Sequence, residues 1–447
     1  MKKAFVCLTV LFSLLASAQY CPGQTQLLTA EVKKQTIDDL SALLPERYAY
    51  KETGQKLREL LQRNLGAGKY DSYNSPVDFS IAVTNDLRSL NHDRHLALDY
   101  NPQAPTTNTN QNNQPPPQLS AEEQAKRASV FNRQMNYGFK EVRFLNGNIG
   151  YLKFDYFDAY LDYSRPVVDA SMVFFKNCDA LIIDLRENGG GGSQMVGYIA
   201  GFFFKEKTLA GRSYNRLTDT SSEEFIDPQP KEKQLPEMDL YVLTSKATVS
   251  AAEALAYNLK YLKKAVVIGE TSAGAANPGR VTRLNNLFTA FIPNRHGMNV
   301  VTGTNWEGKG VPVDIVALAE DALPVARIEI LKKLREKTSD PLQQRKFSNY
   351  ITYLEKTNPE KELPEKTLRQ YAGEYQGGRA VNLTNGKLYY ARVAEAGGPL
   401  HFISADVFML SEGDVTITFK RDKRNRVIGM ERQWSLTSNP AVAAKVK

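Results

Sequence analysis

The stretch that decides the fold is "ALIIDLRENGGGGSQMV", residues 180–196. It begins with a short apolar run, typical of a buried β-strand, which stops at "DLR", residues 184–186. Four glycines at 189–192 leave the backbone bare, and a segment with helical apolar periodicity follows them. Backbone N–H groups exposed at such a junction can hold a negative charge. The junction therefore predicts an α/β fold with an anion site, and we expect Asp184 and Arg186 to fix the loop.

Strand-like and helix-like segments alternate on both sides of this junction. Apolar runs typical of strands are followed by amphipathic segments typical of helices, which indicates an α/β core with a largely parallel sheet. We assign this core to residues 119–340. The predicted strands are "IGYLKF" (149–154), "LYVLTS" (240–245) and "AVVIGE" (265–270), and the predicted helices are 193–204 and 250–262.

Different patterns flank the core. Residues 19–100 place apolar side chains three and four positions apart, which predicts a helical N-terminal domain. Residues 101–118 are rich in Pro, Asn and Gln and cannot build a core, so we expect a linker. Short alternating strands around Asn385-Gly386, a strong hairpin signal, predict a small antiparallel β domain over residues 341–447.

The N-terminus indicates export. Residues 1–18 combine two lysines, a short apolar run and a final Ala-Ser-Ala, which predicts a cleaved signal peptide; a retained membrane anchor is the alternative. No later segment is long and apolar enough to cross a membrane. We expect a protein of the bacterial periplasm or the extracellular space. Two further cysteines, Cys21 and Cys178, are too few for a disulfide framework, and we expect Cys178 to be buried.

Composition excludes several classes of function. The net charge of +8 comes from 57 basic and 49 acidic residues that are mixed along the chain, so we expect no nucleic-acid partner. The glycine run fits neither G-x-G-x-x-G nor a P-loop, and no metal-ligand spacing is present. We therefore expect no cofactor and no metal. These absences argue against a bound nucleotide phosphate at the glycines.

Ser250 lies at a second strand-to-helix junction, in "VLTSKATVSAAEAL", residues 242–255. With Glu253 it fits the S-x-x-E capping box, which would give it a purely structural role. A hydroxyl at a helix N-terminus also lies beside unpaired N–H groups that can stabilise an oxyanion. Because sites in α/β sheets form at the carboxyl ends of adjacent strands, the two junctions together favour a nucleophile.

Three motifs in order resemble one family. "LIIDLRENGGG", the segment 244–279 and "TNWEGKGVPVDI" closely resemble the C-terminal-processing (tail-specific) serine peptidases. The nearest branch contains the tricorn core and the interphotoreceptor retinoid-binding-protein-like peptidases. The resemblance covers roughly residues 85–325 and implies a ClpP/crotonase-like catalytic core. It also implies that Ser250 is the nucleophile.

The base that would accept the Ser250 proton lies outside these three motifs. Relatives with a Ser-Lys dyad carry a lysine after the "GET" strand, but this chain has alanines in "GETSAGAANPG", residues 269–279. The lysines of the following helix, Lys260, Lys263 and Lys264, are expected to face solvent. Of the four histidines, His401 lies in the β tail and His296 in a polar turn.

The remaining histidines share "NHDRHLAL", residues 91–98. The branch places its base in a D-x-H element, which "DRH" matches, so the resemblance implies His95 rather than His92. Glu307 matches the acidic position of the branch and would orient the imidazole. A surface histidine and an ordinary loop glutamate are the alternatives.

The expected protein is a secreted serine endopeptidase. Ser250 would form an acyl-enzyme that water hydrolyses, and the N–H groups of Gly190 (or a neighbouring glycine) and Ala251 would form the oxyanion hole. The partner is a peptide or protein substrate, and a homo-oligomer is possible. No PDZ-like insertion is evident, so tail specificity does not carry over. A non-catalytic binder of hydrophobic ligands and a hydrolase of non-peptide esters are the alternative functions.

Overall fold

The computed structural model describes residues 28–102, 120–263, 265–356, 363–392 and 395–446. It divides into two compact units, the first built mainly from residues before 320 and the second mainly from residues 320–447. The predicted signal peptide and nearly all of the predicted linker lie outside the described residues. No helix among those residues has the length and hydropathy that crossing a bilayer requires.

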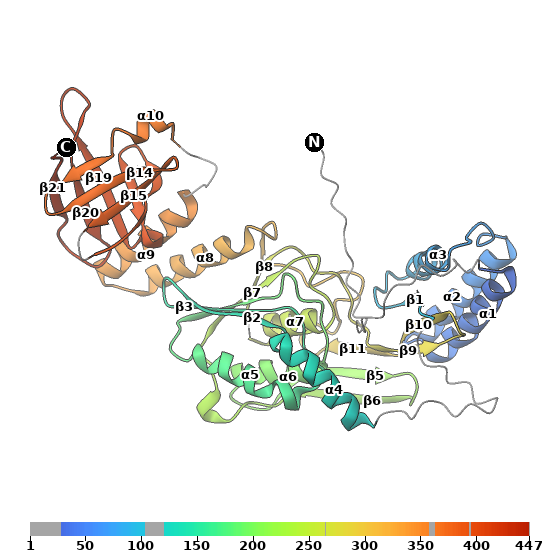
Figure 1. Cartoon of the computed structure of the whole chain (residues 1–447). Helices are drawn as coiled ribbons and strands as arrows, with labels where there is room; N and C mark the ends of the chain where they lie inside the picture. Colours follow the sequence, from blue (N-terminus) through green and yellow to red (C-terminus); the bar gives the residue numbers. More distant parts are fainter. Residues whose placement is uncertain (1–27, 103–119, 264, 357–362, 393–394, 447) are drawn as a thin grey trace. The chain divides into compact units, whose positions relative to one another are not determined.

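The first unit begins with the predicted helices, α1 (Ala30–Arg47), α2 (Lys51–Gly66) and α3 (Pro76–Arg88) (Figure 1). The Thr29 side chain caps α1, and the Ser75 side chain caps α3. Strand β1 (Ala97–Tyr100) then pairs antiparallel with β10 (Phe288–Pro293). The helices bury their apolar faces against this sheet, in a core that includes Ile37, Leu40, Leu57, Phe79 and Phe288.

A six-stranded sheet forms the centre of the α/β core. Its order is β12-β8-β7-β4-β3-β2, and β7, β8 and β12 run parallel, as the alternating pattern predicts. All five residues of β4 are buried, which explains its continuous apolar sequence. The strands are β2 (Phe139–Leu145), β3 (Ile149–Phe154), β4 (Ala180–Asp184), β7 (Asp239–Thr244), β8 (Val266–Gly269) and β12 (Ile315–Val316).

Four helices belong to the same region. Helix α4 (Ala121–Gln134) begins at the capping box of Ser120 and Glu123 that the sequence predicts. Helix α6 packs against α7, and α7 contacts β7 and β8. The last three are α5 (Leu161–Phe174), α6 (Ser193–Ala200) and α7 (Ala251–Lys263).

Two small sheets complete the first unit. One has the order β1-β10-β9, and the other has the order β11-β5-β6. His296, which the sequence places in a turn, lies in β11 and pairs with Tyr214. The chain passes directly from β8 through the loop 270–278 into β9, so this loop connects the six-stranded sheet to the sheet that packs on the N-terminal helices. The remaining strands are β5 (Thr208–Asn215), β6 (Thr220–Ile226), β9 (Gly279–Arg283) and β11 (Arg295–Asn299).

The second unit contains helices and two antiparallel sheets. Asn385 and Gly386 have φ angles of 51° and 75°, as the predicted two-residue hairpin requires. The unit consists mainly of residues 320–447, and within it α8 packs on α9. Its helices are α8 (Ala322–Lys337), α9 (Pro341–Lys356) and α10 (Glu365–Leu368).

In both sheets of the second unit, strands that are consecutive in the sequence are also neighbours in the sheet. The first sheet has β13 (Gly373–Tyr375), β14 (Arg379–Thr384), β15 (Lys387–Arg392) and β16 (Glu395–Pro399). The second has β17 (His401–Ser404), β18 (Val407–Leu410), β19 (Val415–Arg421), β20 (Val427–Trp434) and β21 (Ala441–Ala444). The predicted fold class, α/β multidomain with a helical N-terminal region and an antiparallel C-terminal region, is confirmed. Cys178 is partly exposed rather than buried.

Candidate active site

Ser250 occupies a strained turn between β7 and α7. Its φ of 57° lies in the left-handed region, which residues other than glycine rarely adopt. The turn is held from both sides, because the Thr248 hydroxyl accepts from the Ser245 N–H (2.9 Å) and donates to the Leu185 carbonyl (2.7 Å). Strain of this kind persists where the surrounding structure fixes the backbone, and it is frequent at active sites.

Gly190 lies directly against Ser250. A Cβ atom at Gly190 would come within 2.9 Å of the Ser250 Cβ and 2.7 Å of the Val249 carbonyl oxygen, so only glycine fits. Gly190 itself has a φ of 92°. The Val249 N–H also donates to the Asn188 carbonyl at 3.1 Å. The two strand-to-helix junctions therefore meet, as the sequence predicts.

The backbone N–H groups near the glycine loop differ in whether they already have a hydrogen-bond acceptor. The Gly190 N–H, the first choice from sequence, donates to Asn188 Oδ1 at 2.9 Å. Among the hydrogen bonds between described residues, the N–H groups of Gly191 and Ala251 have no acceptor. The side chain of Asp184 accepts from the Arg186 backbone N–H and guanidinium, which fixes the start of the loop as expected. The neighbouring glycine is thus the better donor.

Glu253 is fully buried beneath Ser250. Its Oε2 accepts from the N–H groups of Ser250 (2.8 Å) and Ala275 (2.9 Å). Its Oε1 accepts from the Ser272 hydroxyl and the Gly274 N–H, each at 2.6 Å. Only half of the predicted capping box is formed, since no hydrogen bond within the described chain engages the Ser250 hydroxyl. The hydroxyl is left free for chemistry.

His95 is positioned by Asp93. The fully buried carboxylate of Asp93 accepts from the His95 N–H (3.0 Å) and the Leu96 N–H (3.3 Å) through Oδ1. Its Oδ2 accepts from the Tyr48 hydroxyl at 2.7 Å. The imidazole stacks on Phe291 with ring centroids 5.6 Å apart. His92, the other histidine of the motif, is exposed.

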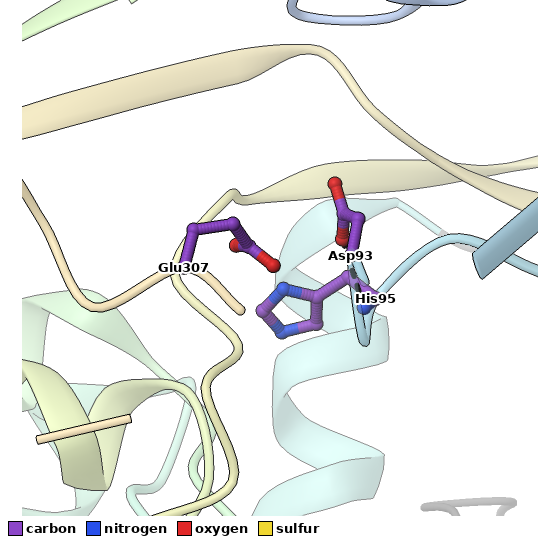
Figure 2. Close-up of side chains that lie close together, drawn as sticks. All are labelled: Asp93, His95 and Glu307. Atoms are coloured by element: carbon purple, nitrogen blue, oxygen red, sulfur yellow. Dashed lines mark hydrogen bonds between the residues drawn. The ribbon is translucent and has the colours of Figure 1, made fainter. Parts of the chain in front are cut away.

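Glu307 faces the imidazole of His95. Its Oε2 accepts from the N–H groups of Ala276 (2.7 Å) and Asn277 (2.9 Å). Its Oε1 and His95 Nδ1 are both buried without a hydrogen-bond partner. Side-chain ligand atoms of Asp93, His95 and Glu307 all lie within 4.8 Å of one another, and Figure 2 shows the Glu307 carboxylate directed at the ring. A small approach would give the hydrogen bond that orients a catalytic histidine.

Burial sets the protonation states of this pair. Desolvation lowers the pKa of His95 below its ordinary value, although the charge of Asp93 acts in the opposite direction. Burial, together with the nearby Asp93 charge, raises the pKa of Glu307 to about 7. At neutral pH the imidazole is therefore held in the neutral form that a general base requires.

The loop 270–278 connects the two halves of the site. Its N–H groups at 274–275 bind Glu253 beneath Ser250, and those at 276–277 bind Glu307 beside His95. No hydrogen bond joins Ser250 to His95 in this structure. The loop thus links the predicted nucleophile to the predicted base through two carboxylates, the buried Glu253 and the partly buried Glu307.

The described lysines of α7 make contacts with residues other than Ser250. Lys260, expected to face solvent, has a side chain only 11% exposed that pairs with Asp314. Lys263 Nζ donates to the Pro236 carbonyl at 3.3 Å. Lys264 lies outside the described residues. Because the described lysines of this helix have other partners, His95 stays the candidate base.

Two family models match the chain. Residues 148–320 match peptidase family S41, and residues 27–140 match the N-terminal domain of Peptidase_S41 in eukaryotic IRBP. The two matches adjoin and together span more than half of the chain. The chain belongs to peptidase family S41.

The solved structures that this S41 peptidase-family member matches are remote from it in sequence. A protein from Parabacteroides merdae, described as a peptidase, is 16% identical with a TM-score of 0.47; the match covers 69% of this chain and 99% of that one. Mature CPAF is 13% identical with a TM-score of 0.46 and the same coverages. The photosystem II D1 C-terminal processing protease is 14% identical with a TM-score of 0.40, covering 66% and 94%.

Three residues of this S41 site make contacts that the sequence does not reveal. Asp93 is visible in the D-x-H motif, but its contacts with the His95 backbone and Tyr48 are not. Tyr48 reaches the site from the end of α1 without any sequence signal. Asn277 donates its N–H to Glu307 and its side-chain amide to Asp93 (3.4 Å), and it lies in the segment that lacks the expected lysine.

Proposed function

We propose that the protein is an exported serine endopeptidase in which Ser250 is the nucleophile, His95 the base and Glu307 the orienting acid. The observation that carries the proposal is the buried pair of unpartnered atoms, His95 Nδ1 and Glu307 Oε1, which face each other. Buried polar atoms without a hydrogen-bond partner destabilise a fold. Such atoms can be retained where a catalytic site needs an acceptor to hold a proton donor in place. Membership of a peptidase family supports the substrate class.

The proposed reaction proceeds in two steps. His95 Nε2 accepts the proton of the Ser250 hydroxyl as Oγ attacks the peptide carbonyl carbon, and the carbonyl oxygen becomes an oxyanion. The C–N bond then breaks, and the amine leaves with the proton from His95. Water attacks the resulting ester with His95 again as base, which releases the acid product and restores Ser250.

Two backbone groups would stabilise the oxyanion. The N–H groups of Gly191 and Ala251 are free among the described residues and belong to the two junctions that meet at Ser250. Preorganised donors of this kind contribute about 3–4 kcal/mol each to transition-state stabilisation. Gly190 serves instead as the close-packed residue that allows the junctions to approach.

Glu307 would act through the imidazole. Once ionised, it accepts the Nδ1 proton of His95, fixes the tautomer that leaves Nε2 free, and offsets the positive charge of the imidazolium. Because its pKa is about 7, this function is complete only above neutral pH. Export, inferred from residues 1–18, would place the enzyme in the periplasm or outside the cell.

A fluorophosphonate probe tests the nucleophile. We expect it to label wild-type protein at position 250, located by peptide mass mapping, and we expect Ser250→Ala to lose both labelling and hydrolysis of a peptide library. Ser221→Ala, at an exposed serine of β6, is the matched control and should behave like wild type. The free hydroxyl makes no hydrogen bond within the described chain, so Ser250→Ala should change stability by no more than about 1 kcal/mol. Undiminished turnover by Ser250→Ala would refute the proposal.

A further inference from the structure

Asn277 joins the two carboxylates that surround the candidate base. Fully buried in the loop 270–278, it donates its backbone N–H to Glu307 Oε2 at 2.9 Å and its side-chain Nδ2 to Asp93 Oδ2 at 3.4 Å. Glu307 faces the imidazole of His95, and Asp93 accepts from the His95 backbone N–H (Figure 2). The position of Asn277 therefore influences where both carboxylates lie around His95.

The side-chain oxygen of Asn277 needs a hydrogen-bond donor. An ionised carboxylate only accepts hydrogen bonds, so the amide turns Nδ2 toward Asp93 and Oδ1 away from it. Oδ1 is buried and has no hydrogen-bond partner within the described parts of the chain. A donor that reached this oxygen would offset its desolvation and hold the amide in one orientation.

Tyr50 is held next to this amide by its ring. The ring stacks on the imidazole of His296 with centroids 4.6 Å apart and 15° between the planes. His296 lies in β11, two residues after Asn294, whose backbone N–H donates to the Pro278 carbonyl at 3.0 Å. Because Pro278 directly follows Asn277, the stack keeps Tyr50 beside the end of the loop that carries Asn277.

The electrostatic surroundings of the Tyr50 hydroxyl agree with this placement. Burial raises the pKa of Tyr50, and the charges of Glu307 and Asp93 raise it further. The side-chain amides of Asn277 and Asn305 act on it in the opposite direction. The hydroxyl therefore lies beside the Asn277 amide, and it stays protonated at neutral pH as a hydrogen-bond donor.

We propose that Tyr50 is a positioning residue, whose hydroxyl donates to Asn277 Oδ1 and thereby sets Glu307 against His95. The inference rests on the proposed function, in which Glu307 orients the imidazole. Tyr50 is 36% exposed, so its ring has room to approach the amide, and hydrogen bonds of active sites often tighten only when substrate binds. With Oδ1 satisfied, the Asn277 N–H stays on Glu307 Oε2, and Oε1 is left for the Nδ1 proton of His95.

Tyr50→Phe tests the hydroxyl while it keeps the stacked ring. We expect kcat on a peptide substrate to fall about tenfold, the effect of one lost hydrogen bond, while KM stays within about twofold of wild type. The rate of fluorophosphonate labelling of Ser250 should fall by a similar factor. Tyr214→Phe is the matched control and should behave like wild type, because the Tyr214 ring also lies against His296 (centroids 5.4 Å apart) but its hydroxyl binds Asp219.

A double-mutant cycle separates positioning from a general loss of structure. In the Glu307→Gln background, Tyr50→Phe should lower the labelling rate by less than about twofold, since no carboxylate is left to orient His95. Wild-type kcat in Tyr50→Phe, or the same tenfold loss with and without Glu307, would overturn the inference. Failure of the peptidase proposal would appear separately, as a wild-type protein that neither labels nor hydrolyses peptides.

Discussion

The loop 270–278 binds a glutamate carboxylate on each of two sides, and the two carboxylates differ in how many of their hydrogen-bond acceptor sites are filled. On one side Glu253 accepts four hydrogen bonds, two on each carboxylate oxygen. On the other side Glu307 accepts two through Oε2, while its Oε1 is buried and bare beside His95. Burial raises the pKa of both glutamates. Burial and the direction of the pKa shift therefore do not distinguish them.

Hydrogen-bond satisfaction is what separates the two sides. A buried carboxylate with every acceptor filled holds the backbone in place and has no capacity left for a substrate or a base. A buried carboxylate oxygen without a hydrogen bond has lost its contact with water and gained nothing in return. A single approaching donor can offset that desolvation cost. We interpret the Glu253 side as the framework of the nucleophile and the Glu307 side as the reactive side. The predictions below test this division.

The largest expected effect is on the reactive side, at His95. His95→Gln should lower kcat on a peptide substrate by about ten-thousand-fold or more, because His95 is the proposed acceptor of the Ser250 proton and glutamine cannot act as a base. His92→Gln is the matched control, since His92 lies in the same motif but is exposed, and it should stay within about twofold of wild type. If His92→Gln were the inactive variant, the base would be assigned to the wrong residue.

Glu307→Gln should have the next largest effect on the rate. The change keeps the size of the side chain but removes the charge that offsets the imidazolium, so we expect kcat to fall roughly a hundred- to thousand-fold. The Michaelis constant should change little, since substrate does not bind to this group. Wild-type activity should rise with pH through about 7, as the His95–Glu307 pair loses protons, and the variant should lack the part of this rise due to Glu307.

A Glu307→Gln enzyme within about threefold of wild type at pH 8 would contradict the assignment. The bare Oε1 would then have no catalytic purpose. The acid that orients His95 would have to be sought elsewhere, and Asp93 would be the first to test because it lies in the same cluster.

The two sides also differ in how far the sequence reveals them. The strand-to-helix patterns locate Ser250 and the glycine run, because those signals are local. The pattern does not show which glycine N–H is free, since that depends on Asn188 folding back onto Gly190. Tyr48 reaches the site from a position far away in the sequence, and no local periodicity encodes such an approach.

On the framework side, Glu253→Gln should mainly reduce stability. A glutamine keeps one acceptor oxygen but turns an NH₂ group toward backbone N–H donors of the loop, so several hydrogen bonds are lost in a buried place. We expect the free energy of unfolding of the first unit to fall by about 2–4 kcal/mol, measured by urea denaturation followed by tryptophan fluorescence. Unchanged stability would show that satisfaction of the Glu253 carboxylate does not hold the loop.

The smallest effect should have the opposite sign, and it concerns the stability of Glu307→Gln. The folded state raises the pKa of Glu307 to about 7 from an ordinary value of 4.5. The fold therefore favours the protonated carboxyl: the resulting stability is complete below pH 4.5 and is lost as the pH rises through 7. Glutamine is always neutral, and its oxygen can still accept from Ala276 and Asn277. The variant's stability relative to wild type should thus grow from pH 4.5 to 7.5 and reach an advantage on the order of 1 kcal/mol at pH 8. Urea denaturation of both proteins across this range measures the difference, and Glu253→Gln, less stable than wild type throughout, is the control. A difference that stays constant with pH would mean that the Glu307 carboxylate is not strained by its burial, and the contrast between the two sides of the loop would lose its energetic basis.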